Sequence, residues 1–323
     1  MTGGSLTRKD RRGQSDEAFK LPRRKGIILA GGTGSRLYPL TEVSSKQLLP
    51  VYDKPMVYYP LTTLMIGGIR EILVISTPEM RPAFERLLGD GREFGLKIDY
   101  MEQPKPAGIA QALLLGEDWL EGAHCCLILG DNIFFGDGLH TIMREAAMKE
   151  EGCTIFSYWV KNPEAYGVIE FDEAGEPLAL REKPQDPKSN FAVVGMYFYD
   201  PTESKRAQAL KPSARGELEI TDLNVTYLEE GKLGVRRLGR GFAWLDAGTP
   251  ETLLQAAAFV QMIEDRQGLK VSCPEEVAWR LGFIGNGDLQ KLIETRGKSA
   301  YSDYLKRLLA ETVSPTYIYT GQH

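Results

Sequence analysis

The sequence is poor in the residues that form disulfides or zinc sites. Its four cysteines (Cys125, Cys126, Cys153 and Cys273) show no C-x-x-C spacing, and two of them lie within apolar runs of strand length. Thiols in such runs usually behave as small buried hydrophobes. We therefore expect neither a disulfide framework nor a zinc site.

The chain also lacks a long apolar run and an excess of basic charge. No run of 18 apolar residues predicts a membrane span, and no apolar stretch follows the first basic residues as in a secretory signal. Lys and Arg number 39 against 44 Asp and Glu, so the net charge of −5 does not favour nucleic-acid binding. We expect a cytoplasmic protein without membrane or nucleic-acid partners, in which a local cluster of cations holds any anionic ligand.

Internal repeats and low-complexity linkers are absent, which favours one continuous fold over independent domains. Residues 1–24 carry seven basic against three acidic residues and show almost no apolar periodicity. Such a composition is typical of a disordered extension, and we predict one over 1–24. We expect an α/β core over 25–249 and a helical C-terminal section over 250–323 that packs on it.

Apolar runs of strand length alternate with segments of helical periodicity in the first half of the chain. The expected strands are 26–30, 71–76, 125–129 and 154–159, and the expected helices are 56–66, 78–88, 107–120 and 139–149. This alternation predicts an α/β fold with a mostly parallel sheet flanked by helices and with ligand loops at the carboxyl ends of its strands. Short strands at 167–171, 178–182 and 193–199 predict added edge strands, and further helices are expected at 251–267, 274–281, 287–295 and 302–309.

A glycine-rich loop, Gly31-Gly32-Thr33-Gly34-Ser35-Arg36, follows the first expected strand. Glycine takes positive φ and lets backbone N–H groups approach phosphate oxygens, and Arg36 adds a forked cation. The dinucleotide motif G-x-G-x-x-G fails because Leu37 stands where the third glycine belongs, and a P-loop fails because its lysine is missing. On this segment alone, a phosphate-binding loop of another type and an ordinary tight turn both stay open.

The next segment supplies a second cation. Lys46 lies ten residues past Arg36, within Ser45-Lys46-Gln47-Leu48-Leu49-Pro50, where its side chain can reach a triphosphate. A lone lysine is most often a solvated charge. The interpretation therefore depends on the combination of the loop, Arg36 and Lys46.

These two segments together resemble a known family. LAGGTGSRLYPLT followed by SKQLLPVYDKPMVYYPL is similar to the sugar nucleotidyltransferases, and most similar to the glucose-1-phosphate thymidylyltransferases. The resemblance extends from about Lys25 to Leu309. It implies a Rossmann-like core and a magnesium-dependent attack of glucose 1-phosphate on the α-phosphorus of dTTP. The products would be dTDP-glucose and pyrophosphate, in the first step of dTDP-rhamnose biosynthesis.

Two acidic residues follow apolar runs that predict strands. Asp131 comes after Leu127-Ile128-Leu129-Gly130, and Asp246 comes after Phe242-Ala243-Trp244-Leu245. Either carboxylate can simply cap a turn or a helix. Mg²⁺ takes one or two carboxylates together with phosphate oxygens and water, and the resemblance implies that Asp131 and Asp246 hold it. The sequence does not show that the two residues converge.

The implied reaction concentrates negative charge on the α-phosphate and on the leaving pyrophosphate, without a covalent intermediate. The expected catalytic residues are Arg36, Lys46, Lys183 and Asp131. The attacking phosphate oxygen is already ionised, so no side chain has to act as a nucleophile. The three histidines are therefore not catalytic candidates.

The remaining substrate contacts are implied by resemblance to family segments. Glu182 is expected to accept hydrogen bonds from sugar hydroxyls, and Lys183 to meet the sugar phosphate. Gln103 is expected to pair with the pyrimidine edge and Gly108 to let the ring approach, although Ala107 stands where relatives often have an acid. The full set of expected substrate-binding residues is Gly31, Gly32, Gly34, Gln47, Gln103, Gly108, Tyr166, Gly167, Glu182, Val193 and Arg215.

Two other functions stay open on the sequence. A uridylyltransferase acting on a sugar 1-phosphate would use the same residues, because burial of a thymine methyl contributes only about 1 kcal/mol. A nucleotide-sugar-binding regulator without catalysis would not need both expected metal ligands. The C-terminal section resembles the family's long form, which implies a homotetramer with an inhibitory second site for dTDP-rhamnose near Gly136 and His140.

Overall fold

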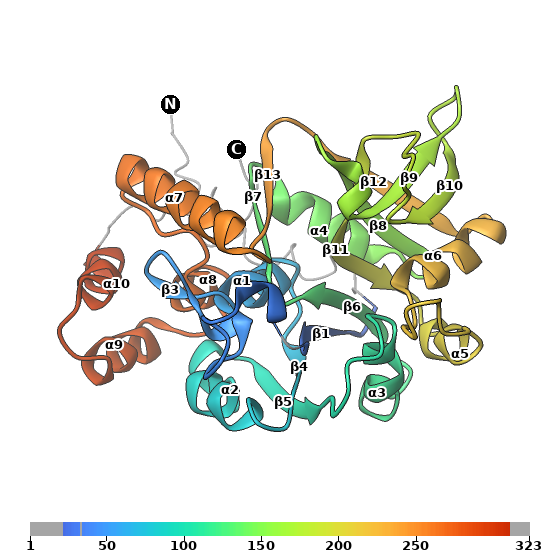
Figure 1. Ribbon diagram of the computed structural model, residues 1–323. Coiled ribbons are helices and arrows are strands. Elements are labelled where there is room, and N and C mark those ends of the chain that lie inside the picture. Colours follow the sequence, from blue (N-terminus) through green and yellow to red (C-terminus); the bar gives the residue numbers. More distant parts are fainter. Residues whose placement is uncertain (1–21, 33, 311–323) are drawn as a thin grey trace, which may run out of the picture.

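The structure is a computed structural model that describes residues 22–32 and 34–310. Four parallel strands, which extend to one edge, form one side of a nine-stranded sheet in this part of the chain. They lie side by side in the order β5 (Lys97–Glu102), β4 (Glu71–Ser76), β1 (Arg24–Ala30) and β6 (His124–Leu129) (Figure 1). They agree with the mostly parallel sheet that the sequence predicts, although β5 was not among the expected strands.

The N-terminal boundary of this core differs from the prediction. β1 begins at Arg24, and the Arg24 guanidinium donates to the carbonyls of Cys125 and Tyr199 at 3.0 and 3.1 Å. The predicted extension 1–24 therefore ends too late, because Arg24 belongs to the sheet. Residues 1–21 of that extension lie outside the described part of the chain.

The strands that follow β6 in the chain only partly match the expected edge strands. β8 (Cys153–Trp159) has β12 (Leu233–Leu238) on one side, and β9 (Gly167–Phe171) pairs with β10 (Pro177–Glu182). β11 (Phe191–Tyr199), predicted at the edge, instead runs antiparallel between β6 and β8. Its run FAVVGMYFY is buried along almost its whole length, which suits an internal strand.

Helices cover both faces of the sheet at β1, β4 and β6, which explains why these strands are almost continuously apolar. Ile28 and Ile128 face the hydrophobic cluster formed with α1 (Tyr58–Ile66), α2 (Arg81–Leu88) and α4 (Leu139–Met148). Ile27 and Leu127 face the cluster formed with α3 (Gln111–Leu120), α5 (Glu203–Gln208) and α6 (Ile220–Glu229). The helix predicted at 107–120 begins only at Gln111, because a loop with Gly108 at φ 99° precedes it.

The C-terminal section is helical, as predicted. Its helices are α7 (Pro250–Gln267), α8 (Pro274–Arg280), α9 (Asn286–Thr295) and α10 (Ala300–Ala310). α8–α10 pack in the α1 cluster, and α9 and α10 lie at the opposite end of the molecule from β9 and β10 (Figure 1). Among the described helices, none is long and apolar enough to cross a membrane.

Two short antiparallel pairings were not predicted, although the run 242–245 was expected to form a strand, and both pairings position the candidate site. β7 (Asn132–Gly136) pairs with β13 (Phe242–Asp246) in a ribbon that leaves the sheet just after β6. β2 (Pro50–Val51) pairs with β3 (Lys54–Pro55) next to the segment that carries Lys46. The two-residue strands β2 and β3 carry too little periodicity to be recognised, and an apolar run such as 242–245 does not specify the strand with which it pairs.

Candidate active site

The glycine-rich loop leaves the carboxyl end of β1 and enters a 3₁₀ turn at Ser35–Leu37. Gly32 and Gly34 adopt φ of 91° and 60°, which glycine takes without strain. Leu37, where the dinucleotide pattern requires glycine, is fully buried and anchors the turn. The Thr41 hydroxyl donates to the Gly34 carbonyl at 2.9 Å, so the loop is fixed from both sides.

Lys46 begins a second 3₁₀ turn, Lys46–Leu48, that lies beside the short β2–β3 pair. The Val57 N–H donates to the Gln47 carbonyl at 2.9 Å. The Gln47 side chain is buried next to Gly130, where a Cβ would lie 2.8 Å from Gln47 Cγ. This arrangement directs Lys46 Nζ to the carboxylate of Asp131, to which it donates a hydrogen bond.

The β7–β13 ribbon brings the two predicted metal ligands together. Its register pairs Asp246 with Asn132, and the Ala247 N–H donates to the Asp131 carbonyl at 3.2 Å. Asp131 therefore follows β6, Asp246 ends β13, and both lie at the carboxyl edge of the sheet. The structure thus shows the convergence that the sequence left open.

The two carboxylates have opposite electrostatic environments. Burial alone would raise the pKa of Asp131, but the Lys46 ammonium and a 2.9 Å hydrogen bond from Asn132 Nδ2 hold it below its usual value. Burial and the neighbouring Asp131 charge raise the pKa of Asp246 to about 6. Asp246 Oδ1 is buried and receives no hydrogen bond from any residue in the described ranges.

Three predicted cations surround this pair. Arg36, Lys46 and Lys183 each lower the pKa of Asp246, although less than its burial raises it. A Cβ on Gly248 would lie 2.7 Å from an Arg36 guanidinium nitrogen and 2.9 Å from Asp246 Oδ1, so both groups crowd against this glycine. The predicted catalytic residues therefore meet in one place, although they come from four separate segments.

The donor set fits a magnesium ion. Within the described residues, no three His, Cys, Asp or Glu side chains converge, as a closed metal site would require. Mg²⁺ usually takes only one or two carboxylates and completes its shell with water and phosphate oxygens. Asp131 and Asp246 supply that number. The buried Oδ1 of Asp246 is an acceptor without a hydrogen-bond donor among the described residues, and a cation can bind it.

The predicted sugar segment forms a polar group next to these cations. The β9–β10 register places Gly167 opposite Glu182, and Ala192 pairs with Val168, which puts the half-buried Val193 beside β9. Glu182 accepts from the Thr221 hydroxyl at 2.7 Å and from Arg215 at 3.2 Å.

Two further predicted residues border this polar group. Arg215 also pairs with Glu219 at 2.9 Å, so carboxylates already hold the predicted phosphate ligand. Burial and then the nearby Asp246 charge raise the pKa of Tyr166, whose ring packs edge to face on Trp244 of β13 with the ring centroids 5.1 Å apart.

The predicted base-reading residues also lie together, and Gly108 lies against protein backbone. A Cβ on Gly108 would lie 2.3 Å from the Leu218 carbonyl oxygen, so its missing side chain makes room for protein backbone. The expectation that Gly108 lets the base ring approach stays a prediction, because this contact concerns only the side on which a Cβ would lie. Gln103 lies against Gly31, where a Cβ would come within 1.9 Å of Gln103 Oε1.

Several functional candidates were missed because nothing in their local pattern marks them. Asn132 Oδ1 accepts from the Gly195 N–H at 3.1 Å and from Trp244 Nε1 at 2.7 Å, so this buried amide joins β7, β11 and β13 behind Asp131. Gln111 contacts Gln103 through its side-chain amide. Direct adjacency to Asp131 was the only available signal for Asn132.

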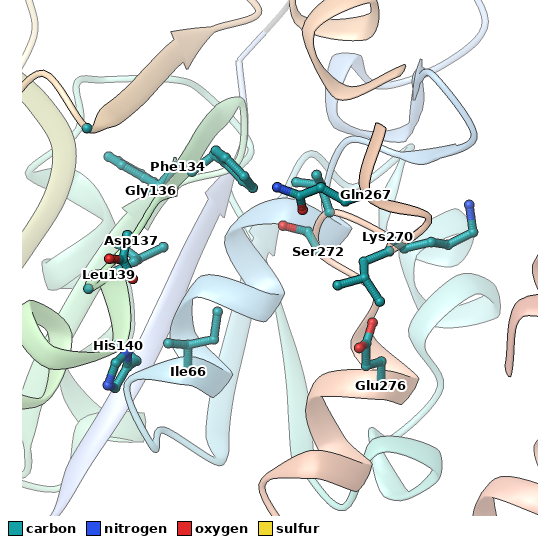
Figure 2. A pocket seen from close by; sticks show the side chains of 15 residues that line it. Ile66, Phe134, Gly136, Asp137, Leu139, His140, Gln267, Lys270, Ser272 and Glu276 are labelled. Atoms are coloured by element: carbon teal, nitrogen blue, oxygen red, sulfur yellow. The ribbon is translucent and has the colours of Figure 1, made fainter. Parts of the chain in front are cut away.

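A pocket of about 680 Å³ lies at the other end of the β7–β13 ribbon. Figure 2 shows Gly136 and His140 on one side of it, with Gln267, Ser272 and Glu276 on the other. The two residues that the sequence assigned to a second site, Gly136 and His140, therefore line one cavity. That cavity is separate from the carboxylate pair.

Comparison with known proteins agrees with this geometry. A family model described as nucleotidyl transferase matches residues 25–262. Glucose-1-phosphate thymidylyltransferases from Neisseria meningitidis and Mycobacterium tuberculosis are each 55% identical over 285 residues, which covers 88% of this chain and 99% of theirs.

Solved structures show the same fold. A Bacillus anthracis protein, described as a candidate glucose-1-phosphate thymidylyltransferase and crystallised with sucrose, is 43% identical with a TM-score of 0.68, over 73% of this chain and 94% of that one. A UDP-glucose pyrophosphorylase with UDP-glucose is 23% identical with a TM-score of 0.66, which supports the fold alone. The chain belongs to the nucleotidyl transferase family, among the glucose-1-phosphate thymidylyltransferases.

Proposed function

We propose that this enzyme transfers dTMP from dTTP to glucose 1-phosphate in a magnesium-dependent reaction that gives dTDP-glucose and pyrophosphate. The observation that carries the proposal is the convergence of Asp131 and Asp246 with Arg36, Lys46 and Lys183. Two carboxylates for a hard cation and three cations for phosphates are what phosphoryl-group transfer requires. The names of the relatives support the choice of substrates.

In this reaction a phosphate oxygen of glucose 1-phosphate bonds to the α-phosphorus of dTTP as the bond to the bridging oxygen of pyrophosphate breaks. Arg36 and Lys46 stabilise the charge that develops on the triphosphate, and Lys183 orients the attacking phosphate. Asp131 and Asp246 would hold Mg²⁺, which neutralises phosphate oxygens when bound. Lys46, which neutralises Asp131 in this structure, is free to contact the triphosphate once the carboxylate has another cation.

The glucosyl ring is proposed to lie against Glu182, Tyr166 and Gly167. Both Glu182 oxygens have partners here, Thr221 and Arg215, so hydroxyl groups of the sugar would replace or join these contacts. The half-buried Val193 lies next to β9 at the side of this group. The base is proposed to lie near Gln103 and the loop from Gly31 to Gly34.

A uridylyltransferase is the second candidate, since uracil differs from thymine by one methyl group. The 23% identical UDP-glucose pyrophosphorylase supports a shared fold and not a shared substrate. A non-catalytic regulator is not favoured, because the chain keeps both carboxylates and the three cations around them.

The decisive test is pyrophosphate release from dTTP and glucose 1-phosphate in the presence of Mg²⁺. We expect turnover that stops when EDTA removes the metal, with UTP used less efficiently than dTTP. Absence of release with either triphosphate would overturn the proposal. A higher kcat/KM for UTP would favour the uridylyltransferase.

The pocket lined by Gly136 and His140 is proposed to bind dTDP-rhamnose as an end-product inhibitor. Its volume of about 680 Å³ is large enough for a nucleotide sugar. We expect dTDP-rhamnose to inhibit the enzyme without competing with dTTP. Purely competitive inhibition would place this ligand in the active site instead.

The enzyme is further proposed to be a cytoplasmic homotetramer. Leu254 and Met262 on α7 are 71% and 53% exposed, which is unusual for large apolar side chains on one helix. Sedimentation at several protein concentrations would test the assembly. A single species of monomer mass at all concentrations would exclude it.

A further inference from the structure

We propose that Gln111, the first residue of α3, fixes the orientation of the Gln103 amide so that the base site accepts pyrimidines with a hydrogen on N3 and rejects cytosine. The inference rests on the proposed function, because it takes Gln103 as the residue that contacts the base. It adds a positioning residue to the site and separates thymine and uracil nucleotides from cytosine nucleotides.

A backbone amide determines which way both glutamine side chains point. The Ala107 N–H can only donate, so the Gln111 atom 2.9 Å from it is the side-chain oxygen Oε1. The same oxygen lies 2.7 Å from the terminal atom of Gln103, which must therefore be the donor Nε2. Oxygen and nitrogen of an amide have nearly the same shape, so only such a network assigns them. Here the network starts from a group that cannot be reversed.

Gln103 itself is held in place from two directions. Its backbone N–H donates to the Ser76 carbonyl at 2.7 Å, and the residue is only 2% exposed. With Nε2 bonded to Gln111, Oε1 faces Gly31, where any Cβ would lie 1.9 Å away. Gln103 Oε1 receives no hydrogen bond from the residues that the structure describes, so this amide presents an acceptor beside the phosphate-binding loop.

An acceptor at this point distinguishes the pyrimidines by their N3 atom. Thymine and uracil carry a hydrogen on N3 and can donate to Gln103 Oε1. Cytosine has a lone pair on N3, so two acceptors would face each other and both would stay unpaired. A site built to hydrogen-bond one group rejects an analogue without it far more strongly than an apolar pocket rejects a missing methyl.

The acceptor on Gln111 is what prevents the Gln103 amide from turning over. If Gln111 offers no acceptor, a half-turn of the Gln103 amide costs no hydrogen bond to Gln111. The amide can then present Nε2, which donates to N3 of cytosine. The consequence is a loss of discrimination against cytosine without any change in the residue that contacts the base.

The test compares kcat/KM for dTTP, dUTP and dCTP at saturating glucose 1-phosphate and Mg²⁺. For Gln111→Leu we expect the dTTP to dCTP ratio to fall by roughly tenfold or more, while the dTTP to dUTP ratio stays unchanged. Gln111→Glu should retain the original ratios, because a carboxylate still accepts from Ala107 and Gln103. Gln208→Leu removes an exposed glutamine amide from α5 and is the matched control.

These ratios are measured within one preparation, so they do not depend on the fraction of folded enzyme. The inference is overturned if Gln111→Leu keeps the dTTP to dCTP ratio of the parent, or if Gln111→Glu loses it. Efficient use of dCTP by the unmodified enzyme also overturns the inference. This outcome tests the inference even if Gln111→Leu does not fold. Failure of the unmodified enzyme with all three nucleotides would instead contradict the proposed function.

Discussion

Asp131 and Asp246 follow similar apolar runs and lie next to each other, yet the protein treats them differently. Asp131 receives hydrogen bonds from Lys46 and Asn132, and its pKa lies below the usual value. Asp246 has a buried oxygen that lacks a donor among the described residues, and burial raises its pKa to about 6. Protein donors therefore satisfy the Asp131 carboxylate, whereas the Asp246 carboxylate can still accept a cation.

If this pair holds Mg²⁺ as proposed, the difference indicates how the site can be stable before the metal binds. If both carboxylates were unpaired, their mutual repulsion and burial would strongly destabilise the site. The Lys46 ammonium balances the negative charge of Asp131. The pairing also keeps the lysine close to the place where a triphosphate would bind. The remaining electrostatic cost of burial falls on Asp246. Groups with perturbed pKa values are common at functional sites.

The largest expected effect of breaking this pair is on turnover. Asp131→Asn and Asp246→Asn should each lower kcat/KM by roughly 10²–10³-fold, because each removes a charged ligand from the ion that stabilises the transferring phosphates. The double variant should be hardly worse than the poorer single variant, since both residues act through one ion. Steady-state pyrophosphate release with Mg²⁺ titration measures this.

The control for the turnover experiment is Asp303→Asn on α10, which removes an exposed carboxylate far along the chain from the pair. It should leave kcat/KM unchanged. Activity within tenfold of the parent for either member of the pair would mean that the residue does not hold the ion.

The sequence predicts the cations around the two carboxylates better than it predicts the difference between the carboxylates. The cations are recognisable from local segments, because Arg36 follows three glycines and Lys46 begins a distinctive turn. The parallel strands β1, β4 and β6 are recognisable for a similar reason, since helices on both faces make them almost continuously apolar. The edge strand β5, with the run KIDYME, mostly alternates polar and apolar residues and was not predicted.

The difference between Asp131 and Asp246 is not visible in the sequence, because it depends on register. The β7–β13 pairing places Asp246 opposite Asn132, and these strands are only five residues long. Asn132 and Gln111 were missed because their partners, Trp244 and Gln103, are distant in the sequence or separated by a loop. β11 was misplaced because an apolar run does not specify its neighbours.

The second prediction concerns stability without metal at pH 7, where the same two substitutions should have opposite effects. Asp131 has a depressed pKa in the folded state, so its charge stabilises the fold above its unfolded pKa, and Asp131→Asn should lower the free energy of unfolding by about 1–2 kcal/mol. Asp246 has a raised pKa, so its charge destabilises the fold at pH 7, and Asp246→Asn should raise that free energy by about 1 kcal/mol.

Thermal unfolding with and without Mg²⁺ measures this second effect. Mg²⁺ should stabilise the parent protein more than either variant, by linkage to binding. Equal destabilisation by both substitutions would show that the two environments do not differ in the way described.

The smallest expected effect is the pH dependence of metal binding. The pKa of Asp246 is about 6, so a proton competes with the cation below that pH, and affinity should fall by up to tenfold per unit between pH 6 and 5. Above pH 7 the carboxylate is ionised and affinity should level off. Binding of Mn²⁺ to the nucleotide-free protein, followed by electron paramagnetic resonance, avoids the titration of the triphosphate.

The comparison can be sharpened with Asp131→Asn in the same measurement. Removal of the Asp131 charge lowers the pKa of Asp246, because that charge contributes to raising it after burial. The affinity that remains is weaker, and as the pH falls it should begin to decrease at a lower pH than in the parent. An unchanged midpoint would mean that burial alone, and not the neighbouring carboxylate, sets the protonation of Asp246.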